Sequence, residues 1–182
     1  MYTDEELTIR PIQQNDLTTL WELIYKEANP EWKQWDAPYF PHSPIAYEAF
    51  MQESENWVNQ DDCWVVTVNN MICGTVSFYY EDAQKIWLEM GIIFYQGAHW
   101  GHGLGTVLSC GTTSFEQRIM FRLGLTTWSG NKRMIRVAEK LGMQMEGRIR
   151  NVRYFNGHYY DSIRMGILRE EWNNNSTRLG QK

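Results

Sequence analysis

The chain of 182 residues has few cysteines and no apolar run that could span a membrane. Its three cysteines are odd in number, and none lies at metal-ligand spacing from another, so neither a disulfide framework nor a zinc-type site is expected. A membrane-spanning helix needs ~20 apolar residues, and no run approaches that length. The N-terminal sequence MYTDEELTIR is acidic, whereas a signal peptide would be basic and then apolar. These absences predict a cytoplasmic protein with reduced thiols, no metal and no membrane contact.

Charge is distributed unevenly along the chain. Up to Asp62 the sequence is strongly acidic, and Arg10, Lys26 and Lys33 are its only lysines and arginines. From Arg118 to Arg153 the balance is reversed, and basic residues dominate. The acidic part suits a cationic ligand and the basic part suits a nucleotide phosphate, although solvated surface charge is the alternative. The net charge of -5 argues weakly against a nucleic-acid partner.

Hydrophobic periodicity predicts a mixed α/β protein without repeats or linkers. Asn69-Asn70 and Asn156-Gly157 separate pairs of β-rich runs, which predicts two hairpins. Ser43 and Pro44 have the residue types of a helix N-cap and first helical position. The polar tail from Asn173 is expected to fray. The expected strands are residues 6–12, 63–68, 72–80, 86–95, 123–128, 143–154 and 158–168. The first expected helix is capped by Asn15 or Asp16 and reaches Ile24, and the others are residues 44–57, 103–118 and 131–141.

A glycine-rich segment carries the strongest functional signal. Gly101, Gly103 and Gly105 occupy alternate positions between an expected strand and an expected helix. Glycines allow a ligand to approach the backbone, and the free N–H groups of a helix's first turn bind anions. Neither the Walker A nor the dinucleotide G-x-G-x-x-G spacing is present. The segment therefore predicts a pyrophosphate site of another kind, with tight packing as the alternative.

Three motifs in order resemble the GNAT superfamily of N-acetyltransferases. Trp100-Gly-His-Gly-Leu-Gly105 resembles its acetyl-CoA motif Q/R-x-x-G-x-G/A, with Trp100 in the Q/R position. The stretches from Asn131 to Met143 and from Asn156 to Trp172 are similar to the RimJ/RimL branch, whose known members acetylate the N-termini of ribosomal proteins. The resemblance implies one GNAT domain over residues 1–172 and a tail over 173–182. It implies a splayed, mixed, mostly antiparallel sheet of about seven strands flanked by four helices.

The resemblance also implies where the co-substrate acetyl-CoA binds, namely between the strands at 86–94 and 123–128. Backbone groups of Ile92, Ile93 and Phe94 would bind the pantetheine arm like an added strand. Asn131 would contact the cofactor, and Arg136, Lys140 or a neighbour would meet the ribose phosphate. The loop residues expected to hold the pyrophosphate are Trp100, Gly101, His102, Gly103, Leu104, Gly105 and Thr106.

Catalysis requires that the amine lose a proton and that a thiolate leave. Glu89 lies where several GNAT enzymes keep a glutamate, so we expect it to act as general base, directly or through water. A glutamate paired on a strand is the alternative. In the branch motif a serine has been proposed as general acid, but Met134 stands in its place. Tyr154, Thr127, Ser129 or solvent remain open for that role.

The acceptor is expected to be a primary amine attacked in a ternary complex. The branch resemblance favours a protein N-terminus, and a small polyamine- or drug-like amine is the second candidate. A non-catalytic acyl-CoA-binding module is an alternative of another class. Homodimers are common in the branch. Trp32, Trp35, Tyr39 and Phe40 lie in an acidic region and are expected to wall the acceptor pocket, with sealing of the core as the alternative.

Overall fold

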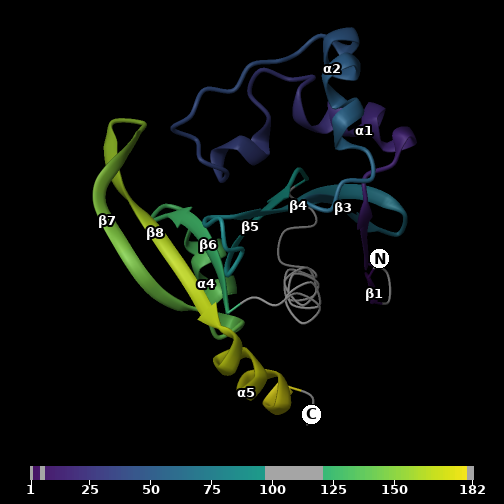
Figure 1. The fold of residues 1–182 in the computed structure, drawn as a ribbon. Coiled ribbons are helices and arrows are strands. Elements are labelled where there is room, and N and C mark those ends of the chain that lie inside the picture. The colour runs from purple at the N-terminus through teal and green to yellow at the C-terminus, as the bar shows by residue number, and fades with distance from the viewer. Residues whose placement is uncertain (1, 5–6, 97–120, 180–182) are drawn as a thin grey trace. The chain divides into compact units, whose positions relative to one another are not determined.

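The computed structural model describes residues 2–4, 7–96 and 121–179 (Figure 1). The helix expected at 103–118 lies outside these residues. The chain forms two compact units, which we describe separately: residues 1–77 with 92–110, and residues 78–91 with 111–182. Strands β4 (Met71–Tyr80) and β5 (Trp87–Phe94) each contribute residues to both units.

The first unit contains an antiparallel sheet. Its strands follow the order β1 (Tyr2–Asp4), β2 (Leu7–Pro11), β3 (Cys63–Val68) and β4. Asn69 and Asn70 join β3 to β4 with φ angles of 49° and 62°, in the left-handed region that asparagine tolerates in hairpin turns. The hairpin predicted here is therefore confirmed. Strand β1 was not expected from the sequence, and it brings the described strands to eight.

Helices α1 (Leu17–Ile24) and α2 (Tyr47–Glu53) share an apolar core with the strands of the first unit. Leucines at successive turns of α1 are fully buried, as an amphipathic helix requires. The principal members of this core are Ile12, Leu17, Leu20, Ile24, Trp32, Phe50, Val65, Ile72 and Tyr95.

The start of α2 differs from the prediction. The helix begins at Tyr47, and neither Ser43 nor Pro44 belongs to it. The preceding segment is held by tertiary contacts, because the Ile45 N–H donates to the Tyr25 carbonyl and the Ile45 carbonyl accepts from the Trp21 indole at 2.7 Å. These bonds use backbone groups that would otherwise be available to a first helical turn.

Tyr95 directly follows β5, and its contacts anchor the end of this strand within the first unit. Its N–H donates to the Cys73 carbonyl at 2.9 Å, and its hydroxyl shares a hydrogen bond of 2.7 Å with Thr75. Its ring meets the Trp32 ring edge to face at 5.5 Å. Burial raises the pKa of Tyr95, so the phenol stays neutral in this hydrogen bond.

The second unit is built around a mixed sheet. Strand β5 pairs in parallel with β6 (Arg122–Trp128), whereas β8 (His158–Leu168) lies antiparallel between β6 and β7 (Gln144–Phe155). Figure 1 shows β7 and β8 as a long curved hairpin. Helix α4 (Lys132–Lys140) connects β6 to β7. The buried apolar residues of these strands include Leu88, Leu123, Leu125, Ile163, Met165 and Ile167.

The C-terminal segment is helical where a frayed tail was expected. Helix α5 (Arg169–Leu179) begins directly after β8, and Trp172 is buried. The Glu171 carboxylate accepts from the Leu168 N–H at 2.9 Å, which satisfies a donor at the helix N-terminus. Within the described part of the chain, no helix is both long and apolar enough to cross a membrane.

Candidate active site

Glu89 is the buried carboxylate at the centre of the second unit. The side chain is 1% exposed, although it lies on a strand whose neighbours Leu88 and Met90 point to the opposite face. A carboxylate removed from water in this way must accept hydrogen bonds from the protein.

Three donors meet the Glu89 carboxylate. Oε1 accepts from the Trp87 indole N–H at 2.7 Å and from Arg122 Nη1 at 3.1 Å. Oε2 accepts from the Thr126 hydroxyl at 3.2 Å, and Arg164 Nη1 lies 3.9 Å from the same oxygen. The carboxylate is therefore both paired and oriented.

The two arginines extend this contact into a network of five charges. Arg122 also donates to Glu146, and Arg164 donates to Glu81 at 3.1 Å. Burial alone would lower the pKa of Arg122, but its hydrogen bonds to Glu146 and Glu89 outweigh burial and raise it. The guanidinium also lies 4.4 Å from the centre of the Trp87 ring. Three carboxylates and two guanidiniums leave one negative charge in excess.

Two glycines provide the space for this network. Gly124 lies opposite Glu89 across the parallel pairing, and Gly166 lies opposite Gly124 across the antiparallel one. A β-carbon on Gly124 would overlap the Glu89 carboxylate and the Arg122 guanidinium, and one on Gly166 would overlap the Glu146 carboxylate. Glycine is required here because side chains from neighbouring strands cross these positions.

The predicted cofactor residues lie only partly within the structure. The loop residues from Trp100 to Thr106 fall outside the described residues. Ile92 and Ile93 are half-buried and Phe94 is buried. A β-carbon on Gly74 would overlap the Ile93 carbonyl oxygen, so β4 approaches the backbone of β5 closely at the position expected to bind the pantetheine arm.

Asn131 has a structural role that the sequence did not reveal. Its side-chain oxygen accepts from the Met134 N–H at 3.1 Å, which makes Asn131 the N-cap of α4. The side-chain oxygen is thus committed to the helix. Ser129 is one of the candidates for the general acid. Its hydroxyl oxygen accepts a hydrogen bond from the Asp161 N–H at 3.0 Å. Thr127 is buried and Tyr154 is exposed.

The aromatic residues predicted to wall the acceptor pocket divide into two groups. Trp32 belongs to the core, where its indole donates to the Leu23 carbonyl at 3.0 Å. Trp35 and Tyr39 are half-buried, and Phe40 is 53% exposed with its ring 4.9 Å from that of Tyr39. The core contacts of Trp32 match the alternative of sealing the core, whereas an acceptor role for Trp35, Tyr39 and Phe40 stays a prediction.

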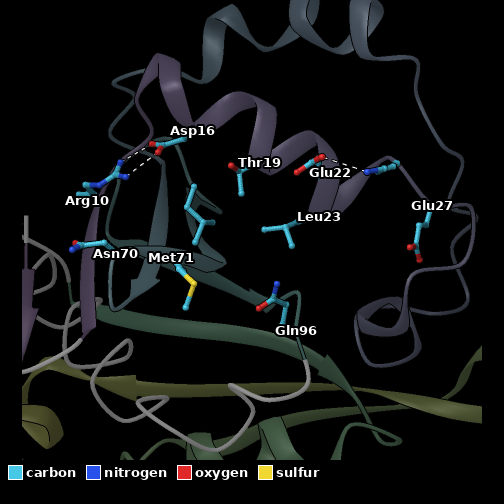
Figure 2. Close-up of a pocket in the computed structure, with 11 residues that line it drawn as sticks. Arg10, Asp16, Thr19, Glu22, Leu23, Glu27, Asn70, Met71 and Gln96 are labelled. Atoms are coloured by element: carbon cyan, nitrogen blue, oxygen red, sulfur yellow. Dashed lines mark hydrogen bonds and ion pairs between the residues drawn. The ribbon is translucent and has the colours of Figure 1, made fainter.

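A groove of about 560 Å³ opens beside α1 in the first unit (Figure 2). Its lining includes three carboxylates, of which Asp16 is paired with Arg10 and Glu22 with Lys26. Figure 2 shows Asn70, Met71 and Gln96 on the side of the groove opposite α1. Among the described residues that line the groove, Glu27 is the carboxylate that forms no ion pair with a lysine or arginine.

The sequence predicted a general-base role for Glu89, which stays a prediction, and it did not indicate the residues that hold the carboxylate. Trp87, Arg122, Thr126 and Arg164 come from three strands, and their contact depends on the parallel register of β5 with β6. The alternation of Arg122, Gly124 and Thr126 along β6 was the available signal, since it places all three on one face. Across the part of the chain that the structure describes, no group of three or more histidines, cysteines or acids is arranged to hold a metal.

Comparison with known families identifies the class of the protein. Residues 6–144 match the model of the acetyltransferase (GNAT) domain family. The chain therefore belongs to the GNAT acetyltransferase family, and it is an acyltransferase with the GNAT fold that uses acetyl-CoA.

Named relatives cover the chain almost completely. An SPbeta prophage-derived uncharacterized N-acetyltransferase, YokL, of Bacillus subtilis (strain 168) is 26% identical over 94% of this chain and 94% of its own length. A putative ribosomal N-acetyltransferase, YdaF, of the same organism is 24% identical over 93% of this chain and 94% of its own. The fold is similar to that of spermidine N-acetyltransferase from Vibrio cholerae, solved with CoA and spermine, with a TM-score of 0.75 and 20% identity over 94% of this chain and all of the other.

Proposed function

We propose that this enzyme transfers the acetyl group of acetyl-CoA to a protein N-terminal α-amine, by direct attack in a ternary complex. The observation that carries the chemistry is the Glu89 carboxylate, which is buried and oriented by three donors, one of them the hydroxyl of the exposed residue Thr126 on β6. A fixed carboxylate at this place can receive the proton that the acceptor's ammonium must lose before its nitrogen attacks the thioester. The name of the putative ribosomal relative and the RimJ/RimL-like motifs support the choice of acceptor.

On this proposal the carrier arm binds along the backbone of Ile92, Ile93 and Phe94, and the segment from Trp100 to Thr106 with Asn131 binds the pyrophosphate end. The loop with Trp35, Tyr39 and Phe40 contacts the acceptor. The protein acts in the cytoplasm and, as is common in the branch, as a homodimer. Acetyl-CoA brings an activated acyl group, and the chain's own residues orient the amine, take up its proton and exclude water.

A small polyamine is the second candidate acceptor. The groove beside α1 carries more carboxylates than cations, and the whole first part of the chain is acidic. Polyamines are cationic along their length, so such a surface attracts them. The similarity in fold to a spermidine N-acetyltransferase is consistent with this candidate.

The test measures thiol release from acetyl-CoA in the presence of an amine panel that contains peptides with free N-termini, the same peptides with blocked N-termini, and spermidine. We expect release with free peptides and not with blocked ones. Release with spermidine alone would replace the first candidate by the second. Binding of acetyl-CoA by calorimetry without thiol release from any amine would identify a non-catalytic module and refute the proposal.

A further inference from the structure

The burial of Glu89 restricts how a proton can reach its carboxylate. Its side chain is 1% exposed, so an ammonium group arriving from solvent cannot touch it directly. A general base must lie within hydrogen-bond reach of the proton that it removes, or be connected to it by a relay. The proton therefore needs a path through another polar group of the second unit.

The two oxygens of Glu89 are not equivalent. Oε1 already accepts two strong donors, the Trp87 indole and the Arg122 guanidinium. Among the described residues, the Thr126 hydroxyl is the one donor within hydrogen-bond distance of Oε2, and Arg164 Nη1 lies farther away, at 3.9 Å. An ionised carboxylate has about four acceptor positions, so Oε2 is the oxygen with room for a proton.

Thr126 connects this oxygen to solvent. The residue is exposed, and its hydroxyl donates to Glu89 Oε2 at 3.2 Å. A threonine hydroxyl is one donor with two acceptor lone pairs, so it can donate to the carboxylate and accept from an ammonium group or a water at the same time. Arg122 and Gly124 share this face of β6, and both keep the carboxylate in place.

We propose that the Thr126 hydroxyl relays the proton of the acceptor's ammonium group to Glu89 Oε2; this inference rests on the proposed acetyl transfer. In the step, the ammonium gives one proton to Thr126 Oγ1 while the hydroxyl proton of Thr126 passes to Oε2. The amine becomes neutral, the carboxylate becomes a carboxylic acid and Thr126 is regenerated. The amine nitrogen then forms the bond to the acetyl carbon and the carbon–sulfur bond breaks. The nitrogen gives up its second proton to the departing CoA thiolate, so the products are the amide and the CoA thiol. Glu89 returns its proton to water by the reverse path.

Tyr79 is the competing hydroxyl, because it lies on the neighbouring strand β4 and is exposed. Partial burial, followed by the charges of Glu89 and Glu81, raises the pKa of Tyr79, and Arg164 lowers it by less. Its phenol is thus neutral and sensitive to Glu89. However, among the described contacts the hydrogen bond to Glu89 Oε2 comes from Thr126 and not from Tyr79. The geometry therefore favours Thr126.

The experiment compares Thr126→Val, Thr126→Ser and Tyr79→Phe with the wild-type protein, using the best acceptor of the amine panel. Thr18→Val is the matched control, since Thr18 is another exposed threonine with a bonded hydroxyl, at 2.9 Å from Tyr47, and lies in the first unit. Valine keeps the shape of threonine and removes the hydroxyl. Circular dichroism and acetyl-CoA affinity establish that each variant is folded.

We expect Thr126→Val to lower kcat/KM at pH 7, and serine to restore it. The loss should be roughly tenfold for an α-amine, of which about a tenth is already neutral at that pH, and roughly 10²-fold or more for a lysine-type amine. The deficit should shrink as the pH approaches the pKa of the acceptor amine, roughly 7.7–8.0 for an α-amine and about 10.4 for a lysine-type amine, because neutral amine then arrives without need of a relay. A purely structural defect would not recover in this way. The relay would be overturned, and acetyl transfer left intact, if a folded Thr126→Val variant kept the wild-type kcat/KM and pH profile. A loss of activity confined to Tyr79→Phe would have the same meaning. Absence of thiol release from the wild-type protein would overturn both the relay and the proposed acetyl transfer.

Discussion

Gly124 on β6 lies directly across from Glu89 on β5, and the carboxylate occupies the space that a β-carbon on Gly124 would need. The same β-carbon would also overlap the Arg122 guanidinium. The ion pair and the glycine are therefore interdependent, although Glu89 lies more than thirty residues before both Arg122 and Gly124.

Gly124→Ala is expected to destabilise the protein by roughly 1–3 kcal/mol, because the extra carbon forces the buried ion pair out of its site. The free energy of unfolding in urea measures the effect. Gly147→Ala is the matched control, since its β-carbon would lie 3.6 Å from the Arg164 β-carbon, an ordinary contact. We expect that control to change stability by less than about 0.5 kcal/mol. Equal stability of the two variants would contradict the crowding that the structure shows.

Glu89→Gln is expected to lower kcat by roughly 10²-fold and to leave the affinity for acetyl-CoA unchanged, since glutamine keeps the shape but cannot accept the proton. Steady-state kinetics and calorimetry separate the two quantities. Glu146→Gln removes the other carboxylate bound to Arg122 and serves as control, with a much smaller loss expected. If Glu89→Gln retains the wild-type kcat and pH profile, Glu89 is only a structural partner of Arg122.

Gly74→Ala is expected to weaken acetyl-CoA binding about tenfold, which corresponds to about 1.4 kcal/mol. The added carbon meets backbone atoms of Ile93 and Phe94, which no side-chain rotation can move, so β5 itself must shift. Isothermal titration with acetyl-CoA measures the change. A folded variant with unaltered affinity would show that the β5 backbone does not hold the carrier arm.

Asp16→Asn tests the ion pair with Arg10. Burial alone would raise the pKa of Asp16, but hydrogen bonds from Arg10 and from the Gln13 N–H outweigh burial and lower it. A carboxyl with a lowered pKa in the folded state stabilises the protein at neutral pH, and this contribution disappears as the pH falls below about 3.9, the unfolded value, and through the folded one.

The wild-type protein should therefore be more stable than Asp16→Asn at neutral pH, and the difference should narrow on acidification below that range. Urea unfolding of both proteins at several pH values provides the comparison. Glu22→Gln, which removes the exposed partner of Lys26, is the control and should show little difference at any pH. A constant gap between wild type and Asp16→Asn would contradict the predicted linkage.

Local sequence signals predicted the strands well. The strand expected at residues 63–68 is Cys63–Val68, and the strand expected at 158–168 is His158–Leu168. Both hairpins form at residues with positive φ angles, including Asn156 and Gly157. Alternation and turn residues are short-range properties, so they can be identified without knowledge of the partners.

Tertiary contacts determine where α2 begins and why the C-terminal residues form a helix, neither of which the sequence predicted. The segment before α2 stays extended because Ile45 is bonded to Tyr25 and Trp21, and the last residues form α5 because Trp172 is buried and Glu171 bonds the chain at the helix start. An acidic first turn, with Glu170 and Glu171, was the missed signal for α5.

Some residues of the candidate site could be predicted from the sequence, and others could not. The motif and the strand pattern pointed to Glu89, whereas its partners Arg122 and Thr126 became apparent only from the pairing of β5 with β6. The register of β5 with β6 could not be read from the sequence, because a parallel pair is joined by a long connection and not by a short hairpin turn that would fix the register.

The buried hydrogen bond between Tyr95 and Thr75 fixes the residue that directly follows β5. Tyr95 lies six positions before Gly101, the first glycine of the glycine-rich segment, and its phenol is hydrogen-bonded to Thr75, twenty positions earlier in the chain. Exchanging Thr75 for a residue without a hydroxyl would leave that phenol buried and unbonded, and the end of β5 would lose its anchor. If β5 binds the carrier arm as proposed, an exchange at Thr75 would change carrier affinity although Thr75 is not among the residues of the proposed cofactor site.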